Sequence, residues 1–296
     1  MSEFEDIVGG KNAEKPESNK SYGEIQRERR QKCYDLLDDA TKKAVGTPDD
    51  FKSFLSVESR FEKYSLNNGL LIYGQRPEAA KLKDYDSWEK DGCQVKKGSK
   101  GVYILEPQTY KSKEGDERVA YNVKSVFDVS DVEGAKPERK VVYDIDILIR
   151  ALVSNAPANI ATNHEYPANV EDNSYYDVAK NTVFVRAGLT HSNIFLAVAE
   201  GLAHAEIASG VDDYRPNEHA FTARSAAYVI AKKYGVDTKP VNIGSVPLKY
   251  SDMDAKDIRA ELSEIHKSVE SISDRMTEYL LVFSEQNKKR DGKGAR

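Results

Sequence analysis

The amino-acid sequence predicts an α+β protein. It is expected to hold an N-terminal domain of helices and a β-hairpin, a mostly helical second domain and a long C-terminal helix. Three patterns support this class. Helix-start signals and helical spacing dominate the first quarter of the chain, the pattern of strands and turns follows after Gly92, and helical spacing returns beyond residue 140. With 296 residues, the chain is long enough for two domains with separate cores.

The first three helices are predicted from their starting signals. Ser21, with Glu24 three residues later, forms a capping box. Thr47 is an N-cap followed by Pro48 at the first helical position and by two acidic residues in the first turn. Ser65 resembles a further cap, so a third helix is expected to begin beside it.

The strands are expected between Gly92 and residue 131. Val95 and Val102–Leu105 flank a turn rich in Lys and Gly, which predicts a β-hairpin. Two further strands are expected at Arg118–Tyr121 and Val123–Asp128.

The second half alternates between helical and extended patterns. In order, the sequence predicts a helix at Ile145–Val153, a loop holding Asn155, Pro157 and Asn159, a strand at Asn181–Arg186, and helices at Ser192–Glu206 and Glu218–Tyr234.

The final helix carries apolar residues spaced alternately by four and three positions, which is the seam of a coiled coil. Two interpretations are open: the helix packs on the body of its own chain, or it joins two copies in a homodimer. The apolar residues available for a dimer are Ile258, Leu262, Ile265, Val269, Ile272 and Met276, and Tyr279 and Phe283 continue the seam.

These patterns divide the chain into six predicted parts. They are a disordered leader (1–20), a first domain (21–131), a linker (132–140), a second domain (141–250), a C-terminal amphipathic helix (251–290) and a basic tail (291–296).

Composition excludes some classes of protein. The formal net charge of -5 argues against a strongly basic DNA binder but allows a local basic groove. No apolar run approaches the roughly 20 residues that cross a bilayer, and no signal-peptide pattern opens the chain, so a cytoplasmic protein without a membrane partner is expected. Cys33 and Cys93 lack the spacing of a metal site or a disulfide framework.

Between Tyr64 and Pro107 the sequence interleaves aromatic and cationic residues. Single-stranded nucleic acid needs both, because aromatic faces stack on bases and cations follow the phosphates. The same aromatic residues can instead fill a core, and composition alone favours the core.

Several short motifs follow one another in this region: Tyr64–Pro77, Trp88 and Gly92, Val95–Val102, Glu106 with Pro107, and Val126–Val129. Together they resemble the N-terminal domain of ArdC-type antirestriction proteins, which conjugative plasmids, integrative elements and phages encode. The resemblance implies an α+β domain that binds single-stranded DNA. The candidate DNA contacts are Asn67, Asn68, Tyr73, Gln75, Arg76, Trp88, Lys96, Lys97 and Lys100.

The helix at Ser192–Glu206 resembles a zinc peptidase helix that has lost most of its ligands. The H-E-x-x-H motif sets two His one turn apart, with a Glu between them as general base. Here Glu200 takes the place of the first His, Gly201 takes the place of the base, and His204 is the second His. In the ArdC family a zincin-like domain follows the DNA-binding one, and Arg224 falls near its third, acidic ligand.

These changes predict a degenerate site with no catalytic residue, no bound metal and no cofactor. A Glu200–Arg224 ion pair is the hypothesis for what braces the two helices in place of zinc. His204 is expected to be a core histidine satisfied by a neighbouring side chain. His191 and His219 are expected on the surface.

The leading hypothesis is therefore a mobile-element or phage protein of the antirestriction type, which binds single-stranded DNA and keeps a pseudo-metallopeptidase domain. One alternative is an active but divergent zinc metallopeptidase. The other is an inhibitor that binds a host defence enzyme without touching DNA.

Overall fold

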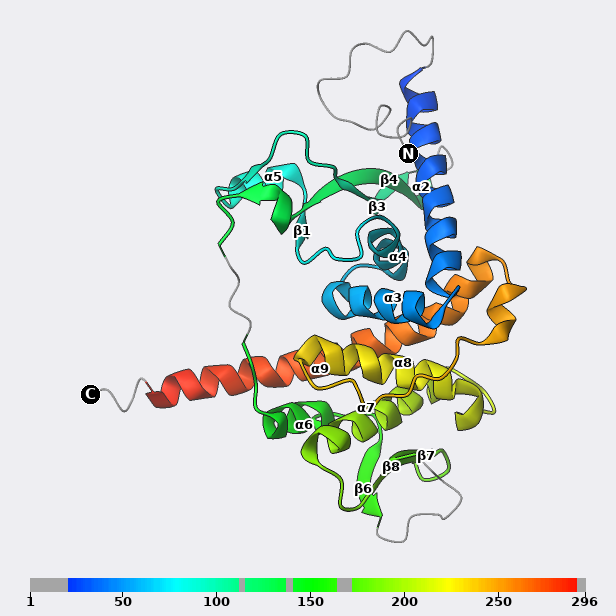
Figure 1. Cartoon of the computed structure of the whole chain (residues 1–296), viewed down its shortest axis with the longest axis vertical. Helices are drawn as coiled ribbons and strands as arrows, with labels where there is room; N and C mark the ends of the chain where they lie inside the picture. Colours follow the sequence, from blue (N-terminus) through cyan, green and yellow to red (C-terminus); the bar gives the residue numbers. More distant parts are fainter. Residues whose placement is uncertain (1–20, 112–114, 137–140, 164–171, 292–296) are drawn as a thin grey trace. The chain divides into compact units, whose positions relative to one another are not determined.

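The computed structural model describes residues 21–111, 115–136, 141–163 and 172–291 (Figure 1). The chain is α+β with a long C-terminal helix, as predicted. It forms two compact units. The first comprises Met1–Val57, Asn67–Pro137 and Leu248–Ile258; the second comprises Glu58–Leu66, Glu138–Pro247 and Arg259–Arg296. The predicted leader and the last five residues of the predicted tail lie outside the described residues.

The first unit begins with helices and continues with strands. Its elements are α2 (Tyr22–Ala44), α3 (Pro48–Phe61, whose last turn belongs to the second unit), α4 (Leu66–Gln75), β1 (Leu82–Lys83), α5 (Tyr85–Lys90), β2 (Gln94–Val95), β3 (Val102–Lys111), β4 (Glu117–Asp128) and β5 (Val132–Glu133).

The predicted helix starts are present. The amide of Glu24 donates to Ser21 Oγ at 3.3 Å and the amide of Ser21 donates to Glu24 Oε2 at 2.6 Å, which completes the capping box of α2. The amide of Asp50 donates to Thr47 Oγ1 at 3.1 Å, so Thr47 caps α3. Local hydrogen bonds therefore fix where these helices begin.

The predicted hairpin between Val95 and Val102 is wrong. Val95 pairs instead with Val132, in the short antiparallel pair β2–β5. The hairpin that forms is β3–β4, which runs from the pair Val102↔Val126 to the pair Lys111↔Glu117. The two strands predicted between residues 118 and 128 form one strand, because β3 pairs with residues 117–126 without a break and β1 pairs with Phe127 and Asp128.

The second unit places a small sheet beside helices. Its elements are α6 (Ile145–Val153), β6 (Asn159–Asn163), β7 (Ser174–Asp177), β8 (Thr182–Arg186), α7 (His191–Ala208), α8 (Pro216–Tyr234) and all but the first residues of α9 (Ala255–Asp291).

The sheet of the second unit has the order β6-β8-β7, with β6 parallel and β7 antiparallel to β8. Asn159, which the sequence places in a loop, begins β6 because its neighbour in space is Thr182 of β8. The helix α7 packs on β7 and β8 and lies against α6 and α8. None of the helices in the described part of the chain is long and apolar enough to cross a membrane.

The apolar seam of α9 is covered within its own chain. Its six central side chains are each at most 2% exposed: Ile258, Leu262, Ile265, Val269, Ile272 and Met276. Of the two interpretations that the sequence leaves open, this burial agrees with a helix that packs on its own chain. The helix continues to Asp291, so it includes the first residue of the predicted basic tail.

A buried charged pair holds α9 within the second unit. His266 Nδ1 lies 2.8 Å from Glu58 Oε2, and both side chains are largely buried, at 11% and 2% exposed. Burial raises the pKa of Glu58, although His266 opposes the shift. Burial alone would lower the pKa of His266, but Glu58 raises it above its ordinary value.

We expect the stability of this unit to fall as the pH rises above about 6.5. Because the folded pKa of His266 is raised, its contribution is complete below its unfolded pKa and is lost as the pH rises through the folded pKa. The raised pKa of Glu58 acts in the same direction. Urea unfolding between pH 6 and pH 9 measures the effect.

In His266→Gln the buried carboxylate loses a charged partner, so the variant should be less stable than wild type at pH 6 by about 3 kcal/mol. The difference should shrink at pH 9. Parallel pH profiles for the two proteins would show that this pair does not titrate with folding.

Candidate functional site

The residues that the sequence predicts as DNA contacts lie in three parts of the first unit. Asn67, Asn68, Tyr73 and Gln75 are on α4 with Arg76 directly after it, Trp88 is on α5, and Lys96, Lys97 and Lys100 are in the turn between β2 and β3.

Two amide side chains of α4 bind the edge of β3. Asn68 Nδ2 donates to the carbonyl of Leu105 at 3.0 Å and Asn68 Oδ1 accepts from its amide at 2.8 Å. Gln75 does the same at Tyr103, with both distances 2.9 Å. These four bonds replace the neighbouring strand that β3 lacks on this side. Asn68 and Gln75 therefore have a structural role, because they join α4 to the edge of β3.

The two aromatic candidates are buried. Tyr73 is 1% exposed and its hydroxyl donates to Asp50 Oδ1 at 2.9 Å. Trp88 is 2% exposed and its indole N–H donates to the carbonyl of Phe127 at 2.9 Å. Their rings are not available to stack on bases, so they fill the core, which is the alternative that composition favours.

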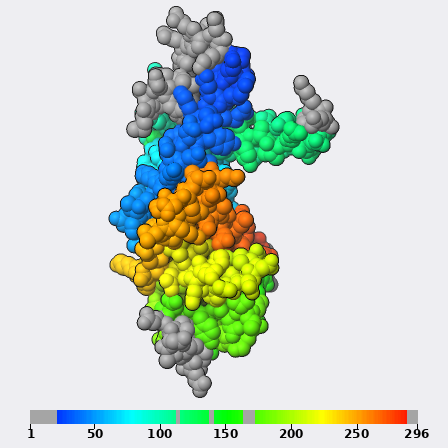
Figure 2. Space-filling view, turned by 90° about the vertical axis from the view of Figure 1, so that its right-hand side faces the viewer, coloured from blue at the N-terminus to red at the C-terminus, as the bar shows by residue number. Residues whose placement is uncertain are grey.

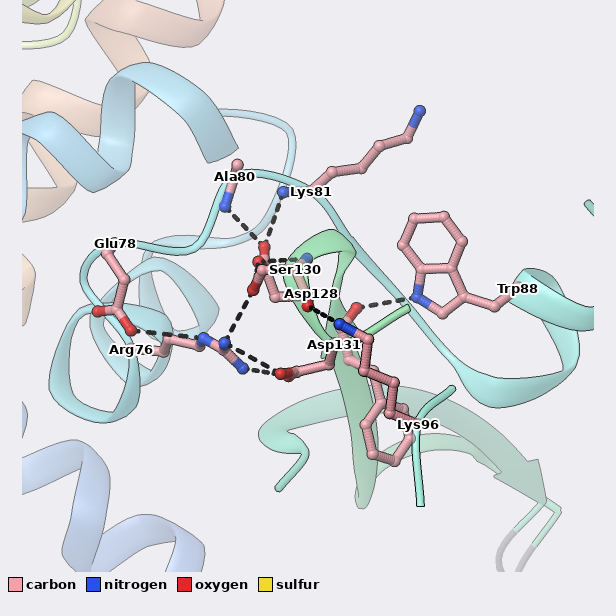
Figure 3. Close-up of polar contacts among 10 residues, drawn as sticks. Arg76, Glu78, Ala80, Lys81, Trp88, Lys96, Asp128, Ser130 and Asp131 are labelled. Carbon is pink, nitrogen blue, oxygen red and sulfur yellow. Dashed lines mark hydrogen bonds and ion pairs between the residues drawn. The ribbon is translucent and has the colours of Figure 1, made fainter. Parts of the chain in front are cut away.

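Arg76 belongs to a polar cluster at the end of β4 (Figure 3). Its guanidinium pairs with Asp131 and donates to Ser130 Oγ at 2.9 Å. The carboxylate of Asp128 accepts hydrogen bonds from the amides of Ala80, Lys81 and Ser130. Burial alone would raise the pKa of Asp128, but these bonds lower it below its ordinary value. The cluster joins the segment after α4 to the end of β4 and the residues that follow it.

The three lysines are exposed and Asn67 is half-buried. Lys96 is held at its backbone, where its amide donates to the carbonyl of Asp131 at 2.9 Å, and at its side chain, where Nζ donates to the carbonyl of Ser130 at 3.0 Å. Lys97 and Lys100 extend from the turn that follows, in which Gly98 has a φ of 85°. Of the predicted contacts, the three lysines are thus the exposed group.

In the second unit the predicted Glu200–Arg224 contact is confirmed. Arg224 Nε lies 3.2 Å from Glu200 Oε1 and joins α8 to α7. The geometry differs from the bidentate pair that the hypothesis assumes. Arg224 Nη2 lies 2.7 and 2.8 Å from the two carboxylate oxygens of Asp172, just before β7. The guanidinium therefore joins three elements.

The charges in this cluster are strongly coupled. Burial raises the pKa of Glu200 to about 7, Arg224 opposes the shift and Asp172 adds to it. Burial alone would lower the pKa of Arg224, but the two carboxylates raise it above its ordinary value. One permanent cation is thus shared by two acidic groups.

His204 is a buried histidine with a neighbouring partner, as predicted. It is 7% exposed, and its Nδ1 lies 2.5 Å from the hydroxyl of Tyr214. Burial lowers the pKa of His204 to about 4, with smaller contributions from His219 and Arg224, so the ring is neutral near pH 7. His219 stacks on Tyr214 with ring centroids 4.8 Å apart and is 18% exposed, so it is a half-buried residue where the sequence predicts a surface one. The prediction for His191 is right, at 61% exposed.

Gly201 allows α7 to lie close to β8. A Cβ atom at this position would be 2.2 Å from Val183 Cγ1 and 3.2 Å from Val183 Cβ. Val183 is fully buried on β8. No side chain fits at the position where a zinc peptidase carries its general base, unless the strand moves.

The residues around His204 do not fit a zinc ion. A catalytic zinc site takes three protein ligands from His, Cys, Asp or Glu. Within residues 21–111, 115–136, 141–163 and 172–291, no group of three such residues is placed to hold a metal. One ring nitrogen of His204 is bonded to Tyr214, and the guanidinium of Arg224 lies where a dication would be repelled.

Sequence reasoning missed two members of this cluster. Tyr214 follows α7 in a loop, and Asp172 precedes a short strand. Neither position carries a periodic pattern or a motif, so only the folded chain brings them to His204 and Arg224.

The close packing of α7 on β8 can be tested with Gly201→Ala. In an open helix this change stabilises by up to about 1 kcal/mol, but here the added methyl overlaps Val183, and overpacking costs about 1–3 kcal/mol. We expect a net loss of stability by urea unfolding. Gly201→Ala combined with Val183→Ala should recover part of it.

Gly23→Ala is the matched control, because α2 has open space around Gly23. That change should be neutral or stabilising. If Gly201→Ala behaves like Gly23→Ala, the contact between α7 and β8 is not tight in solution.

Among known proteins, one family model matches a segment that lies mostly in the first unit. Residues 41–146 match the family model described as the N-terminal domain of anti-restriction factor ArdC. No curated protein matches the chain.

Two solved structures are similar, both of the antirestriction ArdC protein from R388 plasmid. The metal-free form is 16% identical with a TM-score of 0.48, and the alignment covers 72% of this chain and 85% of that one. The Mn(II)-bound form is 14% identical with a TM-score of 0.49, and covers 71% and 84%. The family match confirms the predicted resemblance to ArdC-type antirestriction proteins over residues 41–146.

Proposed function

We propose that this chain is an antirestriction-type protein that binds single-stranded DNA through its N-terminal domain. The observation that carries the proposal is the exposed lysine turn at Lys96–Gly101, inside the segment that matches the ArdC domain. The turn holds three cations in six residues and no acidic residue. Phosphate groups are the partner that such a turn fits, because affinity for nucleic acid rests largely on the neutralisation of phosphates.

The shape of the turn supports this role. One end is fixed by β2, which pairs with β5, and the other end continues into β3. Between them the amide of Ser99 donates to the carbonyl of Lys96 at 3.2 Å. The backbone of the turn is therefore held in place while the side chains of Lys97 and Lys100 stay exposed. A fixed turn loses less conformational entropy on binding than a free loop.

The test removes two charges without disturbing the turn. In Lys97→Gln with Lys100→Gln, we expect weaker binding of a labelled (dT)20 oligonucleotide in fluorescence anisotropy. The slope of log affinity against log salt concentration should fall by about 1.4, since each phosphate contact to a single strand contributes about 0.7.

The control removes the same charge elsewhere, with Lys256→Gln and Lys267→Gln on exposed positions of α9. It should leave the slope unchanged. If wild-type protein does not bind the oligonucleotide at low salt, the single-strand proposal is wrong. The hypothesis of an inhibitor that acts on a host defence protein without DNA is then favoured.

For the second unit, we propose a scaffold or partner-binding role without peptidase chemistry. Three local features support this: the base position is closed by Val183, His204 is bonded to Tyr214, and Arg224 braces the helices. An antirestriction role in a host cell, against a host defence protein, belongs to the same proposal. So does encoding by a plasmid, another mobile element or a phage.

If Arg224 is the brace, a chelator should leave the thermal midpoint of the protein unchanged, while Arg224→Met should lower it. The free energy of unfolding should fall by about 1–2 kcal/mol, because the cluster is partly exposed and two carboxylates lose their cation. Metal analysis of the purified protein is measured alongside. Stoichiometric zinc, or proteolysis that a chelator stops, would instead support the divergent metallopeptidase.

A further inference from the structure

We propose that one face of the β3–β4 ribbon, together with α2, is a platform on which bases of single-stranded DNA stack. The proposal rests on the proposed function and locates the aromatic part of the same binding surface. Its central residues are Tyr121 of β4, which is 43% exposed, and Tyr34 of α2, which is 37% exposed. They take the role that the sequence assigns to Tyr73 and Trp88, which are buried.

The platform lies on the outer half of the ribbon. Beyond Leu105 the side chains of β3 are exposed, and those of the paired half of β4 are exposed or half-buried. Figure 2 shows this part of the ribbon, in green, extending beside α2, in blue. An exposed ribbon of this kind offers both faces to a partner, so the two faces must be distinguished.

The register assigns Tyr121 and Tyr110 to opposite faces. Tyr121 pairs with Pro107 and Tyr110 pairs with Arg118. Residues 118 and 121 are three positions apart on one strand, and side chains alternate between faces along a strand. Tyr121 thus shares its face with Val119 and Lys111, while Tyr110 shares the other face with Arg118.

The helix α2 supplies the second ring. It packs against β4. Partial burial raises the pKa of Tyr34, Tyr121 raises it further, and Arg30 lowers it, so these three side chains are neighbours. Two exposed tyrosines from different elements, with a guanidinium beside them, form a surface of aromatic faces and positive charge.

Charge favours a nucleic acid over an apolar peptide as the occupant. The first half of α2, residues 22–32, carries Arg27, Arg29, Arg30 and Lys32 against two glutamates. On the face of Tyr121, the cation of Lys111 lies opposite Glu117, so the excess of positive charge comes from this half of α2. Aromatic rings interleaved with cations are the surface that binds single strands without a sequence preference, because every base has a face that can stack.

Distance connects the platform with the lysine turn. Lys100 and Pro107, the residue that pairs with Tyr121, are seven positions apart along one extended segment. At about 3.3 Å per residue this spans about 23 Å. A few nucleotides cover that length, within the roughly 4–16 nucleotides that single-strand-binding domains occupy. One strand can therefore meet the cations at one end of β3 and the tyrosines further along it.

The experiment uses a double variant that carries both Tyr34→Ala and Tyr121→Ala. Its control is the single variant Tyr110→Ala. The control changes the same residue type, at 48% exposure, on the opposite face of the same ribbon. Binding is measured by anisotropy with labelled (dT)20 and with an abasic oligonucleotide of equal length. We expect the double variant to bind (dT)20 roughly tenfold more weakly per stacked base lost, and Tyr110→Ala to bind like wild type.

The abasic oligonucleotide separates stacking from phosphate contacts. Wild type should prefer (dT)20 over it, and the double variant should lose that preference while its salt slope stays unchanged. Tyr121→Trp should keep the affinity, and its added indole emission should be quenched by (dT)20 but not by the abasic strand. This variant also shows that a change at position 121 leaves the domain folded.

The failures are distinguishable. If wild type binds no oligonucleotide at low salt, the proposed function fails and the platform fails with it. If wild type binds and the lysine variant weakens binding, but the double tyrosine variant binds (dT)20 like wild type, only the platform is overturned. An equal loss in Tyr110→Ala also overturns it, because the effect would not belong to one face.

Discussion

The organisation of the first unit depends on the four hydrogen bonds between the amides of α4 and the edge of β3. Asn68 and Gln75 bind the backbone of Leu105 and Tyr103, and so occupy an edge that would otherwise be unpaired. An open edge invites another chain, and a helix that covers it removes that hazard. The next outward position on this edge is Pro107, which has no N–H to leave unpaired.

This clamp divides the ribbon into two halves with different roles. The inner half is held by α4 on one strand and, at Asp128, by amides of the preceding loop on the other. The outer half is free of both restraints and carries exposed tyrosines and cations. A rigid root with an exposed outer part is the arrangement expected of a binding element, because the fixed part positions the contacts and lowers the entropy lost on binding.

The sequence predicts those parts of this fold that local interactions decide. The capping box at Ser21 and the cap at Thr47 involve residues three positions apart, so the local sequence is enough to predict them. Strand pairing depends on residues that are far apart in the sequence. The partner of Val95 is Val132, 37 positions away, and no local pattern predicts this pairing. Likewise, nothing local separates a buried Tyr73 from an exposed Tyr121. Residue type therefore shows that aromatic and cationic residues are interleaved, while the fold decides which rings are exposed.

The Glu200–Arg224 contact could be predicted from the sequence. Each residue differs in charge from the zinc ligand expected near its position. The packing at Gly201 could not be predicted, since Val183 reaches it only through the sheet. Both features support the proposal of a second unit without peptidase chemistry. A restored base at position 201 would meet β8, and restored ligands would meet a guanidinium already bound to Glu200 and Asp172. No single substitution reverses both, because one obstacle is steric and the other is electrostatic.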